Sequence, residues 1–264
     1  MDQKCKNPRM SSAAQPFSVS GQTALVTGAR TGIGRAAALA LADAGADLIL
    51  WGRTQEGLAE LAEEIRGRGR TASTVAADLA DTEAVRALAT DLAAMHRIDL
   101  LVNNAGTIRR ADAVDTSWSD WRHVLNVDLD AAFVLARTFG ERMLERGAGR
   151  IVNVASVLSF QGGVRVPAYA AAKHALAGLT KALANEWASG GVNVNAVAPG
   201  YVATDNTDAL RADPDRSRAI LDRIPAGRWA RPEDIAGAIV FLCSPAADYV
   251  HGHVLAVDGG WLAR

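Results

Sequence analysis

Short apolar runs alternate with longer alanine-rich or amphipathic stretches along almost the whole chain. Apolar runs of this length between turn residues are typical of buried strands, and the longer stretches have the length of helices. The pattern predicts strands at residues 23–27, 48–51, 74–79, 98–106, 151–156, 192–200 and 254–260. It predicts helices at residues 35–45, 54–69, 81–96, 118–146, 167–187 and 232–244.

This alternation predicts an α/β fold, in which a doubly wound, Rossmann-like parallel sheet is flanked by helices. The length of 264 residues fits one domain of this kind, and the apolar content of 49% is enough for a large core. We expect the domain to cover residues 21–264, after a mobile N-terminal tail at 1–20. The polar segment 201–229 contains Pro214 and Pro225. It is expected to form a helical excursion beside the substrate.

Composition excludes several other classes of protein. A formal net charge of −1 gives no electrostatic case for a nucleic-acid or membrane partner. No apolar run reaches the ~18 residues of a membrane span, and the N-terminus lacks a signal-peptide core. Met10 offers a second possible start. Cys5 and Cys243 are far apart and the histidines form no metal-binding motif, so we expect a cytoplasmic protein without disulfide or metal.

Candidate binding residues follow the predicted strands, where parallel sheets bind their ligands. The first strand ends in a glycine turn, Gly28 to Gly34, which would let the backbone approach a pyrophosphate at a helix N-terminus. Asp78 follows the third strand and could bind an adenine amino group, or simply flank a helix. The fourth strand runs into Asn103-Asn104-Ala105-Gly106, and the sixth into Pro199-Gly200. Either loop could shape a cofactor site or be a plain turn.

Candidate catalytic residues lie around the helix that contains Tyr169 and Lys173. Positions i and i+4 share one helix face, so the lysine is expected to lie beside the phenol and lower its pKa. A tyrosine of this kind can exchange a proton with an alcohol oxygen, and Ser156 could hydrogen-bond the same oxygen. Asn126 lies inside a predicted helix, where asparagine is unfavourable without a specific role. Taken alone, the Tyr169–Lys173 pair could also be a chance meeting.

Together, these motifs resemble in order and spacing the short-chain dehydrogenases/reductases, from about Gly21 to the end of the chain. The resemblance implies NAD(P)-dependent oxidoreduction of carbonyl and alcohol groups without a catalytic metal. It implies that Tyr169 is the acid–base and that Lys173 binds the nicotinamide ribose. It also implies that Ser156 positions the carbonyl and that Asn126 holds a relay water. Cofactor contacts are then expected from Gly28, Arg30, Thr31, Gly32, Ile33, Gly34, Arg53, Asp78, Leu79, Asn104, Ala105, Gly106, Tyr169, Lys173, Pro199, Gly200, Val202 and Thr204.

A narrower resemblance, in loops such as 108–110, 158–167 and 224–229, is to the sugar-acid dehydrogenases of this family. It implies interconversion of 2,5-diketo-3-deoxygluconate and 2-keto-3-deoxygluconate. A carboxylate substrate needs a cation, and arginine binds carboxylates in a bidentate manner. The expected substrate contacts are Arg109, Ser156, Gln161, Arg165 and Tyr169. Further candidates are Arg110, Arg211 and Arg228, and each arginine could instead be a solvated surface residue.

The sequence does not decide between the two nicotinamide cofactors. An acidic residue that would bind both ribose hydroxyls of NAD is missing after the second strand, where Gly52 and Arg53 stand. This pair, with Arg30 in the glycine turn, favours the 2′-phosphate of NADP(H). The family resemblance favours NAD(H).

Two alternative functions remain open. One is a short-chain reductase for another polyol, ketone or 3-ketoacyl substrate. The other is a non-catalytic, dinucleotide-binding redox sensor, against which the complete set Asn126, Ser156, Tyr169 and Lys173 argues. By analogy with the family, a homotetramer or homodimer is expected, formed through the helices at 117–145 and 167–187 and the C-terminal end at Trp261.

Overall fold

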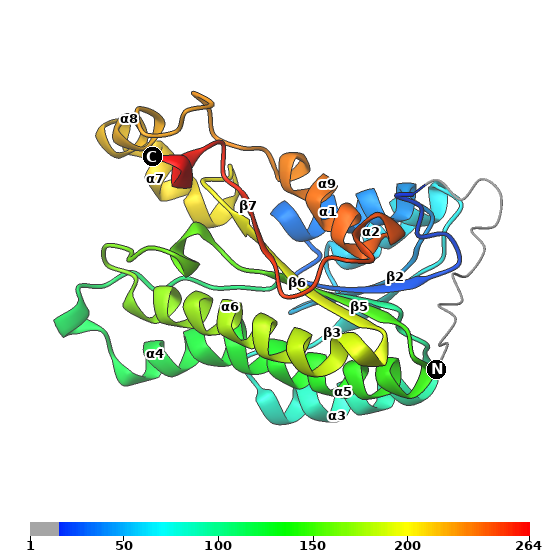
Figure 1. Cartoon of the computed structure of the whole chain (residues 1–264). Coiled ribbons are helices and arrows are strands. Elements are labelled where there is room, and N and C mark those ends of the chain that lie inside the picture. Colours follow the sequence, from blue (N-terminus) through cyan, green and yellow to red (C-terminus); the bar gives the residue numbers. More distant parts are fainter. Residues whose placement is uncertain (1–15) are drawn as a thin grey trace, which may run out of the picture.

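A parallel sheet of seven strands forms the centre of the computed structural model, which describes residues 16–264 (Figure 1). The strand order is β3-β2-β1-β4-β5-β6-β7, and every neighbouring pair is parallel. The strands are β1 (Thr23–Thr27), β2 (Asp47–Gly52), β3 (Ala72–Ala76), β4 (Leu100–Asn103), β5 (Gly149–Val154), β6 (Val192–Pro199) and β7 (Val254–Val257). The direction of winding reverses between β1 and β4. Such a switch point is where doubly wound sheets bind ligands.

Helices cover both faces of this sheet, so the predicted fold class is confirmed. One face packs against α1 and α2 together with α9, and the other against α3, α5 and α6 (Figure 1). The helices are α1 (Gly32–Asp43), α2 (Leu58–Gly67), α3 (Thr82–Met95), α4 (Trp118–Leu125), α5 (Ala131–Arg146), α6 (Pro167–Trp187), α7 (Asp208–Ala212), α8 (Pro214–Leu221) and α9 (Pro232–Cys243). Strand β6 is buried along its whole length, as expected of a strand covered on both faces, and its two asparagines, Asn193 and Asn195, donate side-chain hydrogen bonds to the backbone carbonyl of Val250.

Local sequence signals fix several helix ends. The side chain of Asp81 caps α3 by accepting a hydrogen bond from the backbone N–H of Ala84, 3.0 Å away. Pro232 opens α9 at its first turn, and Gly45 follows α1 with a positive φ of 104°. The predicted helix at 118–146 is helical over its whole length, and a π-helical segment, Asn126–Asp130, lies within it between α4 and α5. Insertions of this kind are frequent at functional sites.

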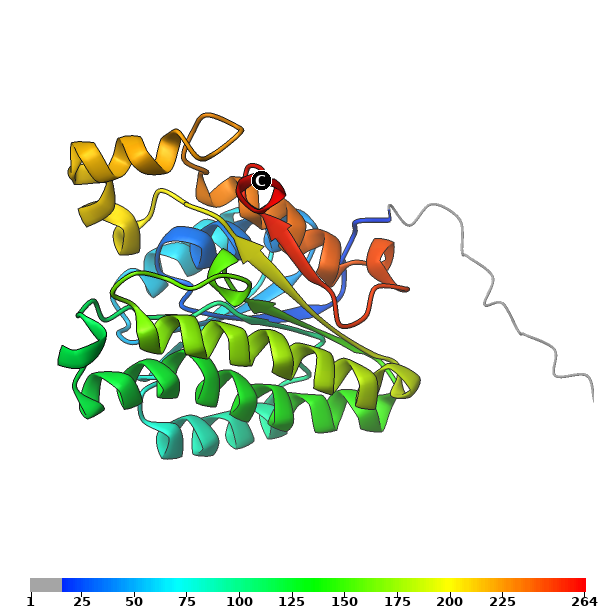
Figure 2. The same ribbon diagram turned by 60° about the vertical axis from the view of Figure 1, so that its left-hand side comes forward.

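The segment 201–229 carries α7 and α8, which project beyond the two helical layers (Figure 2). An aromatic cluster ties it to the C-terminal end of the chain. The ring of Trp261 lies 4.7 Å from that of Tyr201, and the guanidinium of Arg223 lies 4.0 Å above Trp261. Trp261 is therefore only 5% exposed. Its side chain packs against the excursion of the same chain.

Most of the predicted tail, including Cys5 and Met10, lies outside the described residues. Residues 16–20 lie against the domain, where the backbone N–H of Val19 donates to the carbonyl oxygen of Ala44. Cys243 is buried, and burial raises the pKa of its thiol to about 12. Within residues 16–264, no helix is long and apolar enough to cross a bilayer, and no group of side chains is arranged to hold a metal ion.

Candidate active site

The candidate site begins at a joint between the carboxyl ends of β1 and β4. The hydroxyl of Thr27 accepts hydrogen bonds from the backbone N–H groups of Asn104 and Ala105, each 3.0 Å away. In return, the side-chain amide of Asn104 donates to the carbonyl oxygen of Thr27 at 2.9 Å. These bonds hold the glycine turn and the Asn103–Gly106 loop, which are far apart in sequence, as one wall of a cavity.

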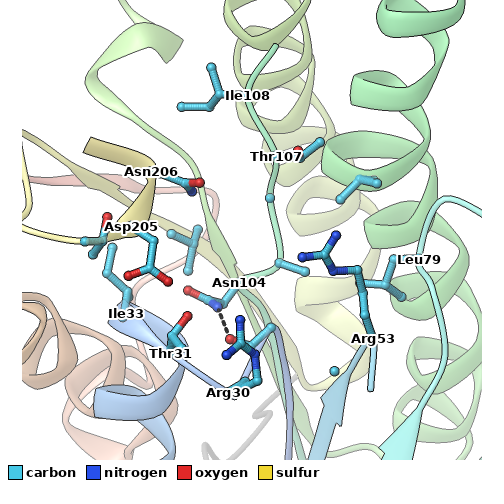
Figure 3. Close-up of a pocket in the computed structure, with 18 of the residues that line it drawn as sticks. Arg30, Thr31, Ile33, Arg53, Leu79, Asn104, Thr107, Ile108, Asp205 and Asn206 are labelled. Carbon is cyan, nitrogen blue, oxygen red and sulfur yellow. Dashed lines mark hydrogen bonds between the residues drawn. The ribbon is translucent and has the colours of Figure 1, made fainter. Parts of the chain in front are cut away.

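Glycine is required at this joint because the backbones approach closely. Gly28 has φ +63°, and a Cβ there would lie 2.9 Å from the Cα of Ala105. A Cβ on Gly34, inside the first turn of α1, would collide with the carbonyl oxygen of Gly28. The turn therefore packs directly against the loop and leaves a cradle at the N-terminus of α1, which Arg30, Thr31 and Ile33 also line (Figure 3). Such a cradle fits a pyrophosphate.

The cavity beside the cradle has a volume of about 650 Å³, which suits a ligand of dinucleotide type. The predicted cofactor positions come together there, and all of them line the cavity except Gly34, which packs beneath the turn. Arg30 and Arg53 extend into the same part of the cavity from the ends of β1 and β2 (Figure 3). Among the described residues, neither of these arginines has an acidic side chain within ion-pair distance.

Three of the predicted catalytic residues meet in this cavity. Tyr169 and Lys173 lie one turn apart on α6, with the Lys173 ammonium 5.4 Å from the centre of the tyrosine ring. Lys173 is 3% exposed, and its Nζ donates to the carbonyl oxygen of Val154 at 2.9 Å. Ser156 follows β5, where its Oγ accepts from the backbone N–H of Leu158. The sequence therefore brings together a phenol, a hydroxyl and a buried ammonium group.

The pKa of Tyr169 differs from the sequence-based expectation. Burial raises this pKa above the ordinary value of a tyrosine, while the Lys173 charge opposes the shift. Asp128 raises the pKa further, and Ser156 and Arg110 lower it. The expected net fall is reversed, because desolvation of the phenolate outweighs the attraction of the ammonium group.

Asn126 does not join the catalytic group. Its side-chain amide donates to the carbonyl oxygen of Ala80 at 3.1 Å, and its oxygen accepts from Arg122 at 3.0 Å. Asp128, two residues further along the π-helical segment, instead points to Lys173, with Oδ2 3.4 Å from Nζ. The sequence analysis missed Asp128. The extra residue in a π turn changes which side chains face inward, and an apolar–polar pattern does not reveal it.

The predicted substrate residues Arg109, Arg165 and Gln161 lie outside the residues that line the cavity. Arg109 pairs with Asp120 at 3.4 Å and Arg165 with Asp112 at 3.1 Å, both at the surface. The further candidates Arg211 and Arg228 are paired with Asp208 and Asp234. Gln161 accepts a hydrogen bond from the indole N–H of Trp261 at 2.9 Å.

Arg110 also lies outside the residues that line the cavity, but within residues 16–264 it forms no ion pair. Its guanidinium donates to the backbone carbonyl of Asn206 at 2.9 Å, and Asn206 lines the cavity. Its charge also lowers the pKa of Tyr169. Arg110 therefore links the loop after β4 to the excursion at the mouth of the site.

Comparison with known proteins agrees with this fold. A family model described as Enoyl-(Acyl carrier protein) reductase matches residues 28–262. The chain belongs to the short-chain dehydrogenase/reductase family and is an NAD(P)-dependent enzyme that acts on CH–OH groups. The resemblance seen in the sequence is thereby confirmed.

Several similar proteins are named as sugar-acid dehydrogenases. The chain is 53% identical over 248 residues to 2-dehydro-3-deoxy-D-gluconate 5-dehydrogenase of Bacillus subtilis, covering 94% of this chain and 97% of that protein. It is 61% identical, with a TM-score of 0.93, to a Beutenbergia cavernae protein assigned as an NAD(P)-dependent gluconate 5-dehydrogenase, with NADP bound at low occupancy. That alignment covers 95% of this chain and 100% of the other. A gluconate 5-dehydrogenase of Burkholderia cenocepacia, in complex with NADP and tartrate, is 39% identical with a TM-score of 0.90, over 94% and 98% of the chains.

Proposed function

We propose that this enzyme interconverts a ketone and a secondary alcohol on a sugar acid, with 2,5-diketo-3-deoxygluconate and 2-keto-3-deoxygluconate as the substrate pair. The observation that carries the proposal is the meeting of Ser156, Tyr169 and Lys173 in the cavity that also holds the glycine cradle. The curated relative of about half identity, a 2-dehydro-3-deoxy-D-gluconate 5-dehydrogenase, supports this choice of substrate.

In this proposal, the glycine turn, Asn104 and the loop at Pro199-Gly200 hold the dinucleotide, whose nicotinamide supplies or accepts hydride when it is bound. Tyr169 donates its phenolic proton to the substrate oxygen during reduction and takes it back during oxidation. Ser156 donates a hydrogen bond to the same oxygen as charge develops there. Lys173 stabilises the phenolate form of Tyr169, because its ammonium group lies next to the ring.

Replacing Tyr169 by Phe is expected to lower turnover by roughly 10²–10⁴-fold, because the proton donor is lost while the ring is kept. Binding of the nicotinamide cofactor, followed by fluorescence titration, should stay close to that of the parent. Tyr249→Phe is the matched control, since Tyr249 is 99% exposed. If Tyr169→Phe kept the turnover of the parent, the assignment of the acid–base would be wrong.

We propose that Arg110 binds the carboxylate of the sugar acid. The evidence is its position between the loop after β4 and Asn206, with its charge close to Tyr169. Arginine recognises carboxylates through paired N–H groups. Arg109 and Arg165 remain second candidates, because each would first have to leave its surface carboxylate partner.

Arg110→Gln should raise the Michaelis constant of a sugar-acid substrate by roughly 10–100-fold, because a charge-assisted contact is lost. The Michaelis constant of an uncharged polyol should change little. Arg109→Gln, in the loop after β4, and Arg165→Gln, in the loop before α6, are measured beside it. If the Michaelis constant of the sugar acid rose strongly in one of these two variants and stayed unchanged in Arg110→Gln, that residue would be the carboxylate-binding arginine instead.

We propose that NADP(H) is the preferred cofactor. Arg30 and Arg53 face the cavity without an acidic partner among the described residues (Figure 3), and Gly52 at the end of β2 brings no acidic side chain. Two guanidinium groups are suited to a ribose 2′-phosphate. The bound NADP in the Beutenbergia and Burkholderia structures supports the same choice.

Arg53→Ala is expected to raise the dissociation constant of NADPH by roughly 10-fold or more, because a phosphate contact is removed. NADH lacks that phosphate and provides the control within the same experiment, so its dissociation constant should be nearly unchanged. Equal losses for the two cofactors, or tighter binding of NADH by the parent, would contradict the proposed preference.

We also propose that the enzyme is a cytoplasmic homotetramer or homodimer. Large apolar side chains on α4 and α5 support self-association, with Trp118 74% exposed and Phe133 44% exposed. Sedimentation equilibrium should give a multiple of the 27.7 kDa chain mass. A mass of one chain across the working concentration range would contradict this expectation.

A further inference from the structure

A buried carboxylate lies behind the catalytic pair, and the mechanism above does not use it. Asp128 comes from the π-helical segment between α4 and α5, and its side chain is 0% exposed. Its Oδ1 accepts a hydrogen bond from the backbone N–H of Thr107 at 2.7 Å. Its Oδ2 makes no hydrogen bond within residues 16–264 and lies 3.4 Å from Nζ of Lys173. Removing a carboxylate from water in this way is costly unless a charged partner compensates.

The chain around Asp128 keeps the carboxylate in this position. The π turn directs Asn126 to Ala80 and leaves Asp128 facing inward. Gly106 provides the remaining space, since a Cβ there would lie 3.1 Å from Oδ2 of Asp128 and 3.5 Å from Nζ of Lys173. Lys173 is therefore held from two sides, by the carbonyl oxygen of Val154 and by the carboxylate.

Charges from several elements converge on this carboxylate. Lys173 and Tyr169 belong to α6, and His123 belongs to α4. Arg110, in the loop after β4, acts on Tyr169. Burial raises the pKa of Asp128, and Lys173 and the N–H of Thr107 oppose the shift. The ionised carboxylate offsets part of the positive charge that Lys173 presents to the phenol. This offset explains why Asp128 raises the pKa of Tyr169.

We propose that Asp128 is a positioning residue, which holds the ammonium group of Lys173 and sets the pH range in which Tyr169 exchanges its proton. The inference rests on the proposed acid–base role of Tyr169. When Asp128 is ionised, the lysine charge is partly balanced and the phenol keeps its proton to higher pH. When Asp128 is neutral, the full ammonium charge acts on the phenol and favours the phenolate.

The test is a titration of tyrosinate absorbance in the parent and in Asp128→Asn, each corrected by its own Tyr169→Phe variant. The midpoint of Tyr169 should fall by about one pH unit in Asp128→Asn, because a nearby negative charge is lost. Asp130→Asn is the matched control. Asp130 lies in the same π-helical segment, but its carboxylate pairs at the surface with Arg122, 3.1 Å away. Its titration should match that of the parent.

A second readout is the pH dependence of kcat/KM for alcohol oxidation, whose rising limb should shift downward by the same amount. The absorbance titration needs no substrate. A shifted midpoint in a parent enzyme that turns over no sugar acid would therefore reject the proposed substrate and keep the role of Asp128. An unchanged or raised midpoint in folded Asp128→Asn overturns the inference. A second variant, Asp128→Ser, also removes the charge but carries a smaller side chain. If neither variant folded, the carboxylate of Asp128 would have a purely structural role, and the inference would be overturned.

Discussion

The hydrogen bonds between Thr27 and the Asn104–Ala105 backbone are the contacts on which the site depends. They fix the ends of β1 and β4 to each other at the point where the sheet reverses its winding. The glycine cradle lies on one side of this joint, and the loop leading to Arg110 lies on the other. In a doubly wound parallel sheet, such a junction forms at the carboxyl ends of the strands where the winding reverses. The side chains of the loops at this junction then determine which ligand is bound.

The second constraint is electrostatic and is centred on the ammonium group of Lys173. It is almost fully buried, and the Val154 carbonyl, the Asp128 carboxylate and the Tyr169 ring all lie around it. Each neighbour affects how strongly the charge acts on the phenol. The chemistry of Tyr169 therefore depends on a balance between burial and nearby charges, rather than on a tyrosine–lysine pair alone.

The sequence predicted the features that depend on local spacing. Apolar runs marked the seven strands, and the i, i+4 rule placed Tyr169 beside Lys173. It could not show that a π turn would direct Asn126 away and bring Asp128 inward, because that choice depends on the packing of α4 against α6. It also could not distinguish Arg110 from Arg109, since the partner of Arg110, Asn206, lies 96 residues further along the chain.

The most direct test of the proposed function is the reduction of 2,5-diketo-3-deoxygluconate by the parent enzyme, followed as loss of reduced-nicotinamide absorbance with NADPH and with NADH. The account predicts clear turnover, with a kcat/KM at least about tenfold higher with NADPH, because two arginines face the 2′-phosphate region. No turnover by protein shown to bind NADPH, together with reduction of another polyol-derived ketone or a 3-ketoacyl compound, would contradict the sugar-acid assignment. Equal or better efficiency with NADH would contradict the cofactor assignment.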